Sequence, residues 1–289
     1  MAGDGAGGEG SEARAGVVMG VRRGPFEGRL DADLLQRYAA ATKDPSPRVA
    51  AGTAAAPVAI VTQIWDAQHE SRPDIVSRYV QRTATGGVHG EHDVVLHRPI
   101  VPGEPLRIWA EGHGARPAGR NSLVTVRYVA LDADDAVVAE QWWTTVYLGT
   151  TCDPVGEPPP EHAFPDDVRE RPIGTWRVDV DVDMARRYAE VSGDWSGHHF
   201  DLAAARQSGF DRLFLHGLCT MALCAQGVVQ LVADGDPERV RRVAVRFATP
   251  TFLGDVLQVQ LYDAAPLGCA FEAVSGGATV ITHGRAELR

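Results

Sequence analysis

The 289-residue sequence lacks the marks of several protein classes. No run approaches the roughly 18 consecutive apolar residues that a membrane-spanning helix needs, so we expect no membrane span. Positive charge is scarce, with 28 Lys and Arg against 38 Asp and Glu. The net charge of −10 argues against nucleic acid or an anionic membrane surface as the main partner. The four cysteines contain no C-x-x-C pair, which favours a reduced cytoplasmic protein with buried thiols.

The chain contains an internal repeat with an offset of about 150 residues. Two blocks recur in the same order and at nearly the same spacing, which indicates a duplicated module of about half the chain. The first block is Asp31, Asp33, Arg37, Tyr38, Ala39 and Asp44, which recurs as Asp181, Asp183, Arg187, Tyr188, Ala189 and Asp194. The second is Pro99, Gly103, Glu104 and Leu106, which recurs as Pro250, Gly254, Asp255 and Leu257.

The repeat defines the expected domain organisation. Residues 1–16 carry six glycines and no apolar segment, which is typical of a disordered leader. An N-terminal module spans 17–149, a Pro-rich and acidic linker spans 150–172, and a C-terminal module spans 173–289. With 44% hydrophobic residues, the chain can bury a core in each module.

Periodicity predicts the same order of elements in both modules. Asp183 is the expected cap of a helix that ends at Gly193, Asp201 that of a short helix ending near Gly209, and 217–232 is a helix apolar on most sides. The expected strands are 88–98, 106–111, 123–131 and 137–148 in the first module, and 240–248, 255–263, 269–275 and 279–288 in the second. Helices followed by an antiparallel meander predict an α+β fold, with two modules packed as an internal pseudo-dimer.

Polar chemistry is concentrated in the second copy. At an offset of 150, His199 corresponds to Val49 and His216 to Asp66, whereas Asp194 keeps its counterpart Asp44. Asp194 and His199 follow a helix end in a Gly-containing loop that can bring both side chains to one water. Gly217 opens the apolar helix, where free N–H groups suit a developing oxyanion. This combination indicates chemistry next to a carbonyl, such as water addition to an enoyl thioester.

Structural interpretations compete with the functional ones. Asp194 fits a turn carboxylate equally well, and His216 fits a hydrogen-bonded core histidine better than a catalyst. A metal cluster of His198, His199, Asp201 and His216 is conceivable, but the spacing does not match a metal motif, and we predict no metal. Four arginines on one strand fit an exposed edge better than a contact to carrier phosphates: Arg239, Arg241, Arg242 and Arg246.

Two ordered motifs resemble a known family. They are Tyr188-Ala189-x-x-Ser192-Gly193-Asp194-Trp195-x-x-x-His199-x-Asp201 and Phe214-Leu215-His216-Gly217-Leu218-Cys219-Thr220. They are similar to the signature of (R)-specific enoyl-CoA hydratases, also called MaoC-like or type-2 hydratases. The first half resembles the degenerate N-terminal module of the two-module members, so the resemblance covers about residues 20–289.

The resemblance implies a double hot-dog fold, in which an antiparallel sheet wraps a buried central helix in each module. It implies an N-terminal module that shapes the acyl pocket and a C-terminal module in which Asp194 and His199 activate water and the Gly217 N–H holds the thioester oxygen. No cofactor is implied, and the substrate is an acyl-CoA or acyl carrier protein thioester of lipid metabolism. We also expect substrate contacts from Ser196, His198, His216, Leu218 and Arg246.

The sequence departs from the family pattern between the two expected catalytic residues. Ser196-Gly197-His198 stands where members usually have Asn-Pro-Leu or Asn-Pro-Ile, and Ala225 stands where short-chain members often have Ser. A non-catalytic thioester-binding protein is therefore one alternative, and a hot-dog thioesterase is a second. The acyl group, the carrier and the order of proton transfer stay open, and the protein could be a monomeric pseudo-dimer or a homodimer.

Overall fold

The computed structural model describes residues 14–161, 164–266 and 268–289. Its N-terminal half contains β1 (Arg22–Arg29), α1 (Ala32–Thr42), α2 (Pro47–Ala50), η1 (Ala59–Gln63), α3 (Trp65–Ile75), α4 (Arg78–Thr83), β2 (Gly86–Leu96), β3 (Pro105–Ala118), β4 (Asn121–Leu131) and β5 (Val137–Leu148). The rest contains β6 (Val155–Gly156), η2 (Asp166–Glu170), β7 (Pro172–Asp179), α5 (Met184–Ser192), η3 (Gly197–His199), α6 (Leu202–Gln207), α7 (Gly217–Leu231), η4 (Pro237–Arg239), β8 (Val240–Phe247), β9 (Val256–Asp263), β10 (Cys269–Ser275) and β11 (Ala278–Leu288).

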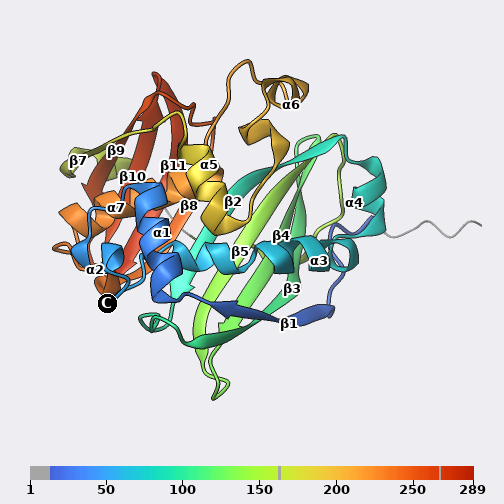
Figure 1. The fold of residues 1–289 in the computed structure, drawn as a ribbon. Coiled ribbons are helices and arrows are strands. Elements are labelled where there is room, and N and C mark those ends of the chain that lie inside the picture. Colours follow the sequence, from blue (N-terminus) through green and yellow to red (C-terminus); the bar gives the residue numbers. More distant parts are fainter. Residues whose placement is uncertain (1–13, 162–163, 267) are drawn as a thin grey trace, which may run out of the picture.

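The strands form one antiparallel sheet, in which the strand order of the first half is mirrored in the second half. The order is β1-β3-β4-β5-β2-β8-β11-β10-β9-β7, with β6 added on β3. β2 and β8 meet in the middle, where Val94 pairs with Val243 and Asp93 with Ala244. The 150-residue offset of the repeat takes Asp93 to Val243 and Val94 to Ala244, so it exchanges the two pairs, and the modules meet as a two-fold symmetric pair would. Figure 1 shows the two halves side by side, with β2 and β8 adjacent.

The predicted strands are confirmed, and two strands at the sheet edges were missed. β5 and β10 have the predicted bounds, whereas β3 is longer than the predicted 106–111 because it continues beside β4. β1 and β7 pair only on one side, with β3 and β9. Their side chains are mostly exposed, so neither strand carries the alternating apolar pattern of a half-buried strand.

Helices α1 and α5 pack across the boundary between the modules. Their equivalent tyrosines, Tyr38 and Tyr188, are fully buried with ring centroids 6.2 Å apart. α5 ends at Gly193, which has the predicted left-handed conformation (φ 78°). Asp183 lies at the predicted N-cap position of α5, but it makes no capping hydrogen bond. Its backbone is helical, and its side chain instead accepts a hydrogen bond from Arg187 at 3.1 Å.

The central helices of the two modules differ in burial. α7 is buried along nearly its whole length, as predicted from its apolar surface. At the offset of the repeat, α3 takes the equivalent place against β1 and β3, but it is shorter and buries only Ala67, Ser71 and Ile75. The expectation of a buried central helix thus holds fully for the second module, whereas α3 keeps a polar, partly exposed face.

Both expected connecting segments take part in the fold where they are described. Most of the predicted leader 1–16 lies outside the described residues, but Arg14 donates a hydrogen bond to the Thr151 carbonyl at 2.6 Å. The segment 150–172 was predicted to be too polar for a core element. In its described part, however, Val168 is fully buried and packs in a small cluster with Tyr262 and Ala270. The other cluster of buried apolar residues in the described chain is a single core that spans both modules.

Candidate active site

A loop after α5 carries most of the predicted site residues, and we call residues 193–201 the site loop. Its first residue is Gly193, and two features of the structure favour glycine at this position. The positive φ disfavours any side chain, and a Cβ there would lie 3.2 Å from Cδ1 of Trp65 in α3. The N-terminal module therefore contacts the beginning of the site loop directly.

Asp194 is fixed by its own loop. Its Oδ1 accepts hydrogen bonds from the Ser196 backbone N–H at 3.0 Å and from the Ser196 hydroxyl at 2.6 Å. The side chain is 18% exposed, and Oδ2 is not used by this turn. Ser196, which departs from the family pattern, thus holds the carboxylate in place and leaves one oxygen for another partner.

The first module contains the same turn without the histidines. Asp44 Oδ1 accepts a hydrogen bond from the Ser46 N–H at 2.9 Å, as Asp194 does from Ser196. The equivalent histidine positions hold Val49 and Asp66. The carboxylate turn therefore belongs to the repeated scaffold, and the second copy adds the imidazoles. The structural and the functional interpretation of Asp194 are therefore compatible: Oδ1 belongs to the turn, and Oδ2 is left for another partner.

His199 is buried with one nitrogen left free to accept a proton. Its Nδ1–H donates a hydrogen bond to the Phe214 carbonyl at 2.9 Å, which leaves the Nε2 lone pair without this partner. Its ring stacks on His216, with centroids 3.7 Å apart. Burial lowers the pKa of His199 to about 2, helped by the neighbouring His216, so the ring is neutral at physiological pH.

His216 ties the site loop to the start of α7. Its Nε2–H donates to the Asp194 carbonyl at 2.9 Å and lies 4.0 Å from Asp194 Oδ2. Burial lowers its pKa, against the raising effect of Asp194. Its Nδ1 is buried without a hydrogen-bond partner in the described structure. The prediction of a hydrogen-bonded core histidine therefore holds for one ring nitrogen only.

Gly217 lies at the first position of α7, where helix geometry leaves its N–H without an intrahelical partner. A Cβ at this position would lie 3.1 Å from the ring of Phe247 at the end of β8. Glycine therefore lets the Phe247 ring approach the helix start. The helix dipole and the free N–H make this end of α7 suited to a partial negative charge.

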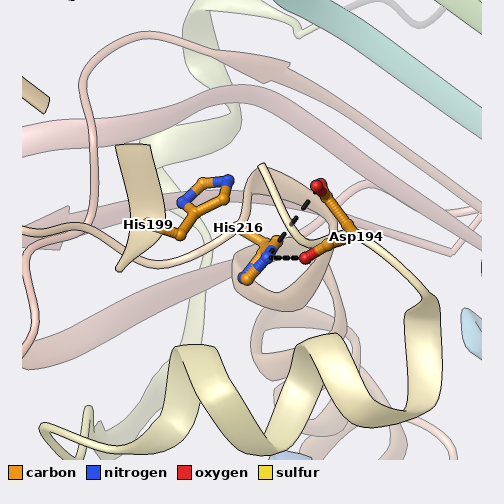
Figure 2. A group of neighbouring side chains, drawn as sticks. All are labelled: Asp194, His199 and His216. Atoms are coloured by element: carbon orange, nitrogen blue, oxygen red, sulfur yellow. Dashed lines mark hydrogen bonds and ion pairs between the residues drawn. The ribbon is translucent and has the colours of Figure 1, made fainter. Parts of the chain in front are cut away.

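Three of the predicted residues converge on one point. Asp194, His199 and His216 each offer an oxygen or nitrogen atom within 4.8 Å of those of the other two, as Figure 2 shows. A single water can bridge two acceptors at such a separation with hydrogen bonds of about 2.8 Å. The arrangement can thus hold and polarise one water between a carboxylate and a neutral imidazole.

The same three side chains are a possible metal site within the described ranges. The His216 ring favours the water. Its Nε2 is already used for the Asp194 carbonyl, and its other nitrogen, Nδ1, is buried without a hydrogen-bond partner. Only Asp194 and His199 Nε2 are then left to bind a metal ion. The metal cluster considered from the sequence also included His198 and Asp201, but Asp201 instead caps α6 through the Ala203 N–H at 2.8 Å.

The remaining predicted contact residues have mixed positions. His198 is partly buried and stacks on Phe214, next to His199. Burial lowers its pKa as well. Leu218 is buried in the first turn of α7 beside Gly217. Arg246 is not brought to this group, because it forms an ion pair with Glu91 of β2 at 3.0 Å.

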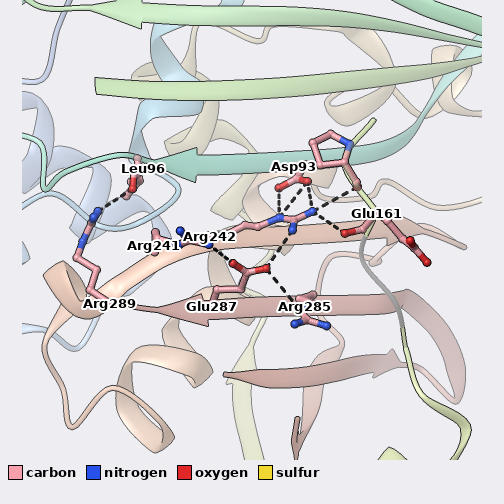
Figure 3. Close-up of polar contacts among 9 residues, drawn as sticks. Asp93, Leu96, Glu161, Arg241, Arg242, Arg285, Glu287 and Arg289 are labelled. Carbon is pink, nitrogen blue, oxygen red and sulfur yellow. Dashed lines mark hydrogen bonds and ion pairs between the residues drawn. The ribbon is translucent and has the colours of Figure 1, made fainter. Parts of the chain in front are cut away.

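The arginine cluster on β8 was predicted to be an exposed edge, and this prediction is wrong because β8 is a central strand. Each of the four arginines has a carboxylate partner. Arg242 is the most buried: it contacts Asp93 at 2.6 Å and Glu287 at 3.0 Å, and it also donates to the Glu161 carbonyl of the connecting segment (Figure 3). Burial raises the pKa of Asp93 to about 6, against the effect of Arg242. Arg242 and Arg246 thus join the modules, through Asp93 and Glu91 of β2.

A row of aromatic rings leads from the candidate active site into the N-terminal module, and the sequence did not indicate it. The rings of Phe247 and His89 lie 4.8 Å apart, and His89 stacks on Trp143 at 3.8 Å. Trp143 contacts Trp65 at 6.4 Å, and Trp65 contacts His69 at 4.5 Å. We call these five residues the aromatic row. The offset of the repeat was the available signal, since it aligns Trp65, the first residue of α3, with Leu215, which lies just before α7.

Comparison with known proteins shows what the chain is similar to. Residues 165–265 match the family described as MaoC like domain. The chain has a double hot-dog fold, as predicted. A MaoC-like dehydratase from Phytophthora capsici superimposes with a TM-score of 0.79 at 20% identity, covering 95% of this chain and 96% of that one. A conserved Mycobacterium tuberculosis protein described as a double hot-dog fold gives 0.58 at 16% identity, covering 94% and 96%.

Two relatives with enzyme names are similar in sequence. Peroxisomal multifunctional enzyme type 2 of Mus musculus is 42% identical over 91 residues, which cover 32% of this chain and 12% of the relative. 3-hydroxyacyl-thioester dehydratase Y of Mycobacterium tuberculosis is 27% identical over 196 residues, which cover 66% of each. The matched regions thus span only part of each relative.

Because the His216 ring is already hydrogen-bonded through Nε2 and enclosed at Nδ1, we predict that metal removal has no effect on stability. Dialysis against a chelator should change the melting temperature by less than about 2 °C, and added Zn²⁺ should affect the wild type no more than His199→Ala. The measurement is a thermal melt near neutral pH. A loss of stability that Zn²⁺ restores in the wild type but not in His199→Ala would show that the cluster holds a metal.

The buried ion pair between the modules predicts a large effect of Arg242→Met. The variant leaves Asp93 buried without its partner, whereas Glu287 keeps Arg241, so the free energy of unfolding should fall by roughly 3–5 kcal/mol in urea titrations. Arg239→Met is the matched control, because Arg239 pairs with an exposed Asp234, and its loss should stay below about 1 kcal/mol. Equal losses in both variants would contradict the assignment.

Proposed function

We propose that the protein adds water to trans-2-enoyl thioesters to give (3R)-hydroxyacyl thioesters, or catalyses the reverse dehydration. The observation that carries the proposal is the convergence of Asp194 and a neutral His199 near the start of α7. A carboxylate and a neutral imidazole can bind and deprotonate one water, and a free helix N-terminus can hold the thioester oxygen. The names of the relatives, a thioester dehydratase among them, support this reaction class.

In the proposed reaction, water lies between Asp194 Oδ2 and His199 Nε2. Its oxygen forms a bond to C3 while the electron pair of the C2=C3 bond moves toward the thioester. The Gly217 N–H stabilises the negative charge that develops on the thioester oxygen. One proton from the water then passes to C2 through one of the two side chains, so the product contains one whole water. Ser196 acts as a positioning residue, because it binds the carboxylate and not the water.

We also propose a division of work between the modules. The C-terminal module supplies the reacting groups, while the N-terminal module covers the acyl chain. The aromatic row supports this division, since four of its five members come from the N-terminal half and meet Phe247 beside Gly217. Both modules lie in one chain, so a second chain is not needed to build the site.

A thioester of coenzyme A is the proposed partner, in a reducing compartment such as the cytoplasm. The four cysteines are free and buried, which suits a compartment that keeps thiols reduced. In the described part of the chain, no helix is long and apolar enough to cross a membrane.

Turnover of crotonyl-CoA, followed by the loss of enoyl absorbance, tests the proposed function. Asp194→Asn and His199→Ala should each lower kcat/KM by about a hundredfold or more, because each removes a partner of the reacting water. Asp44→Asn is the matched control: it changes the equivalent turn of the first module and should retain activity within about threefold.

Two other outcomes would identify the alternative functions. Tight acyl-CoA binding without turnover of any enoyl thioester would indicate a non-catalytic binding protein, and thiol release from saturated acyl-CoA would indicate a thioesterase. Full activity of both His199→Ala and Asp194→Asn would overturn the assigned roles.

The low pKa of His199 predicts a flat acid side of the pH profile. A histidine with an ordinary pKa of about 6.5 loses its base form as the pH falls through that value. Since the pKa of His199 is about 2, it stays neutral, and kcat/KM for crotonyl-CoA should change by less than about threefold between about pH 8 and pH 6. An acid limb with an apparent pKa near 6.5 would contradict this protonation state.

A further inference from the structure

A cavity of about 430 Å³ lies in the N-terminal module, away from Asp194 and His199. It is formed where α3 is too short and too polar to fill the space against α4, β2 and β5. Its polar lining comes from Gln68, His69, Arg72, Gln81 and Tyr147, and three small residues also line it: Ala84, Gly86 and Gly87. The volume is within the range of small-molecule pockets.

The cavity is rich in hydrogen-bond donors and has no acidic lining residue. Arg72 donates from Nε to the Tyr147 hydroxyl at 3.0 Å and lies over its ring at 5.5 Å, which orients the guanidinium. Its terminal nitrogens have no carboxylate partner among the residues described. Gln68 accepts a hydrogen bond from Tyr128 through Oε1, so its amide N–H groups are left to donate. In a chain of net charge −10, an oriented arginine in an acid-free cavity favours an anion.

The aromatic row connects this cavity with the candidate active site. It begins at Phe247 beside Gly217 and ends at His69, which lines the cavity. Trp65, at the start of α3, also contacts Gly193 of the site loop. Arg72 is seven residues further along α3, or about 10 Å at helical rise. An extended apolar chain can cover this distance along aromatic surface, whereas the phosphates of a carrier gain nothing from such a surface.

We propose that the cavity binds the distal end of the acyl chain, and that the preferred substrates carry a carboxylate at that end. The inference rests on the proposed function, because it assumes that the thioester lies at Gly217. Arg72 is then a specificity-determining residue that forms a charge-assisted hydrogen bond with the distal carboxylate. Arg72 is exposed, so the bound carboxylate keeps part of its hydration and the effect is moderate.

Calorimetry with saturated acyl-CoAs tests the cavity without depending on turnover. The ligands are octanoyl-, dodecanoyl- and hexadecanoyl-CoA and their ω-carboxyl analogues. For at least one chain length, the wild type should bind the ω-carboxyl form about tenfold more tightly than the plain form. Arg72→Met should lose this preference and bind the plain acyl-CoA within about twofold of the wild type. Arg78→Met, which changes the same charge on α4 outside the cavity, is the matched control and should keep it.

Three results would overturn the inference. The first is that the wild type shows no preference for the ω-carboxyl form at any chain length. The second is that Arg72→Met loses affinity equally for both ligand forms, which would indicate a contact to the carrier phosphates, and the third is that Arg78→Met loses the preference as Arg72→Met does. Crotonyl-CoA is too short to reach the cavity, so its turnover by the wild type tests the proposed function separately. If the wild type fails to hydrate crotonyl-CoA but keeps the Arg72-dependent preference, the hydratase proposal fails and the cavity assignment stands.

Discussion

The pairing of β2 with β8 is the interaction on which the rest of the structure depends. It joins the two halves into one sheet, and it buries Asp93 and Arg242 on neighbouring strands, where each needs the other. Removing Arg242 would leave the buried Asp93 charge without compensation. The same pairing brings Phe247 at the end of β8 against His89 of β2, so the module boundary and the approach to Gly217 are built by the same two strands.

Duplication explains why one half of the molecule can specialise. The turn in which Asp44 binds the Ser46 N–H recurs at Asp194 and Ser196, so the carboxylate position existed in both copies. The second copy adds two stacked imidazoles above that carboxylate. The first copy instead has a shorter, more polar central helix, which leaves a cavity next to α3. In our account, one copy provides the chemistry and the other provides the space for the substrate.

The sequence alone predicts the parts of this arrangement that depend on local patterns. The strands, the cap at Gly193 and the buried α7 follow from periodicity and from glycine chemistry. The repeat identifies His199 and His216 as additions to a shared scaffold. Contacts between distant segments have no such local signal. The arginine pattern that includes Arg242 fits an exposed edge strand, and only the pairing of β8 with β2 shows that the strand is central. The contact of Trp65 with Gly193 likewise forms only when the two modules pack.

The central claim is that a single water is held by Asp194 and His199 and is delivered to one face of an enoyl thioester. The stereochemistry of the product tests it most directly. Crotonyl-CoA is incubated with the protein, and the product is then offered to a (3S)-specific 3-hydroxyacyl-CoA dehydrogenase with NAD⁺. Our account predicts a hydrated product that this dehydrogenase does not oxidise, because it has the (3R) configuration. Oxidation of the product, or release of free thiol in place of hydration, would contradict the account.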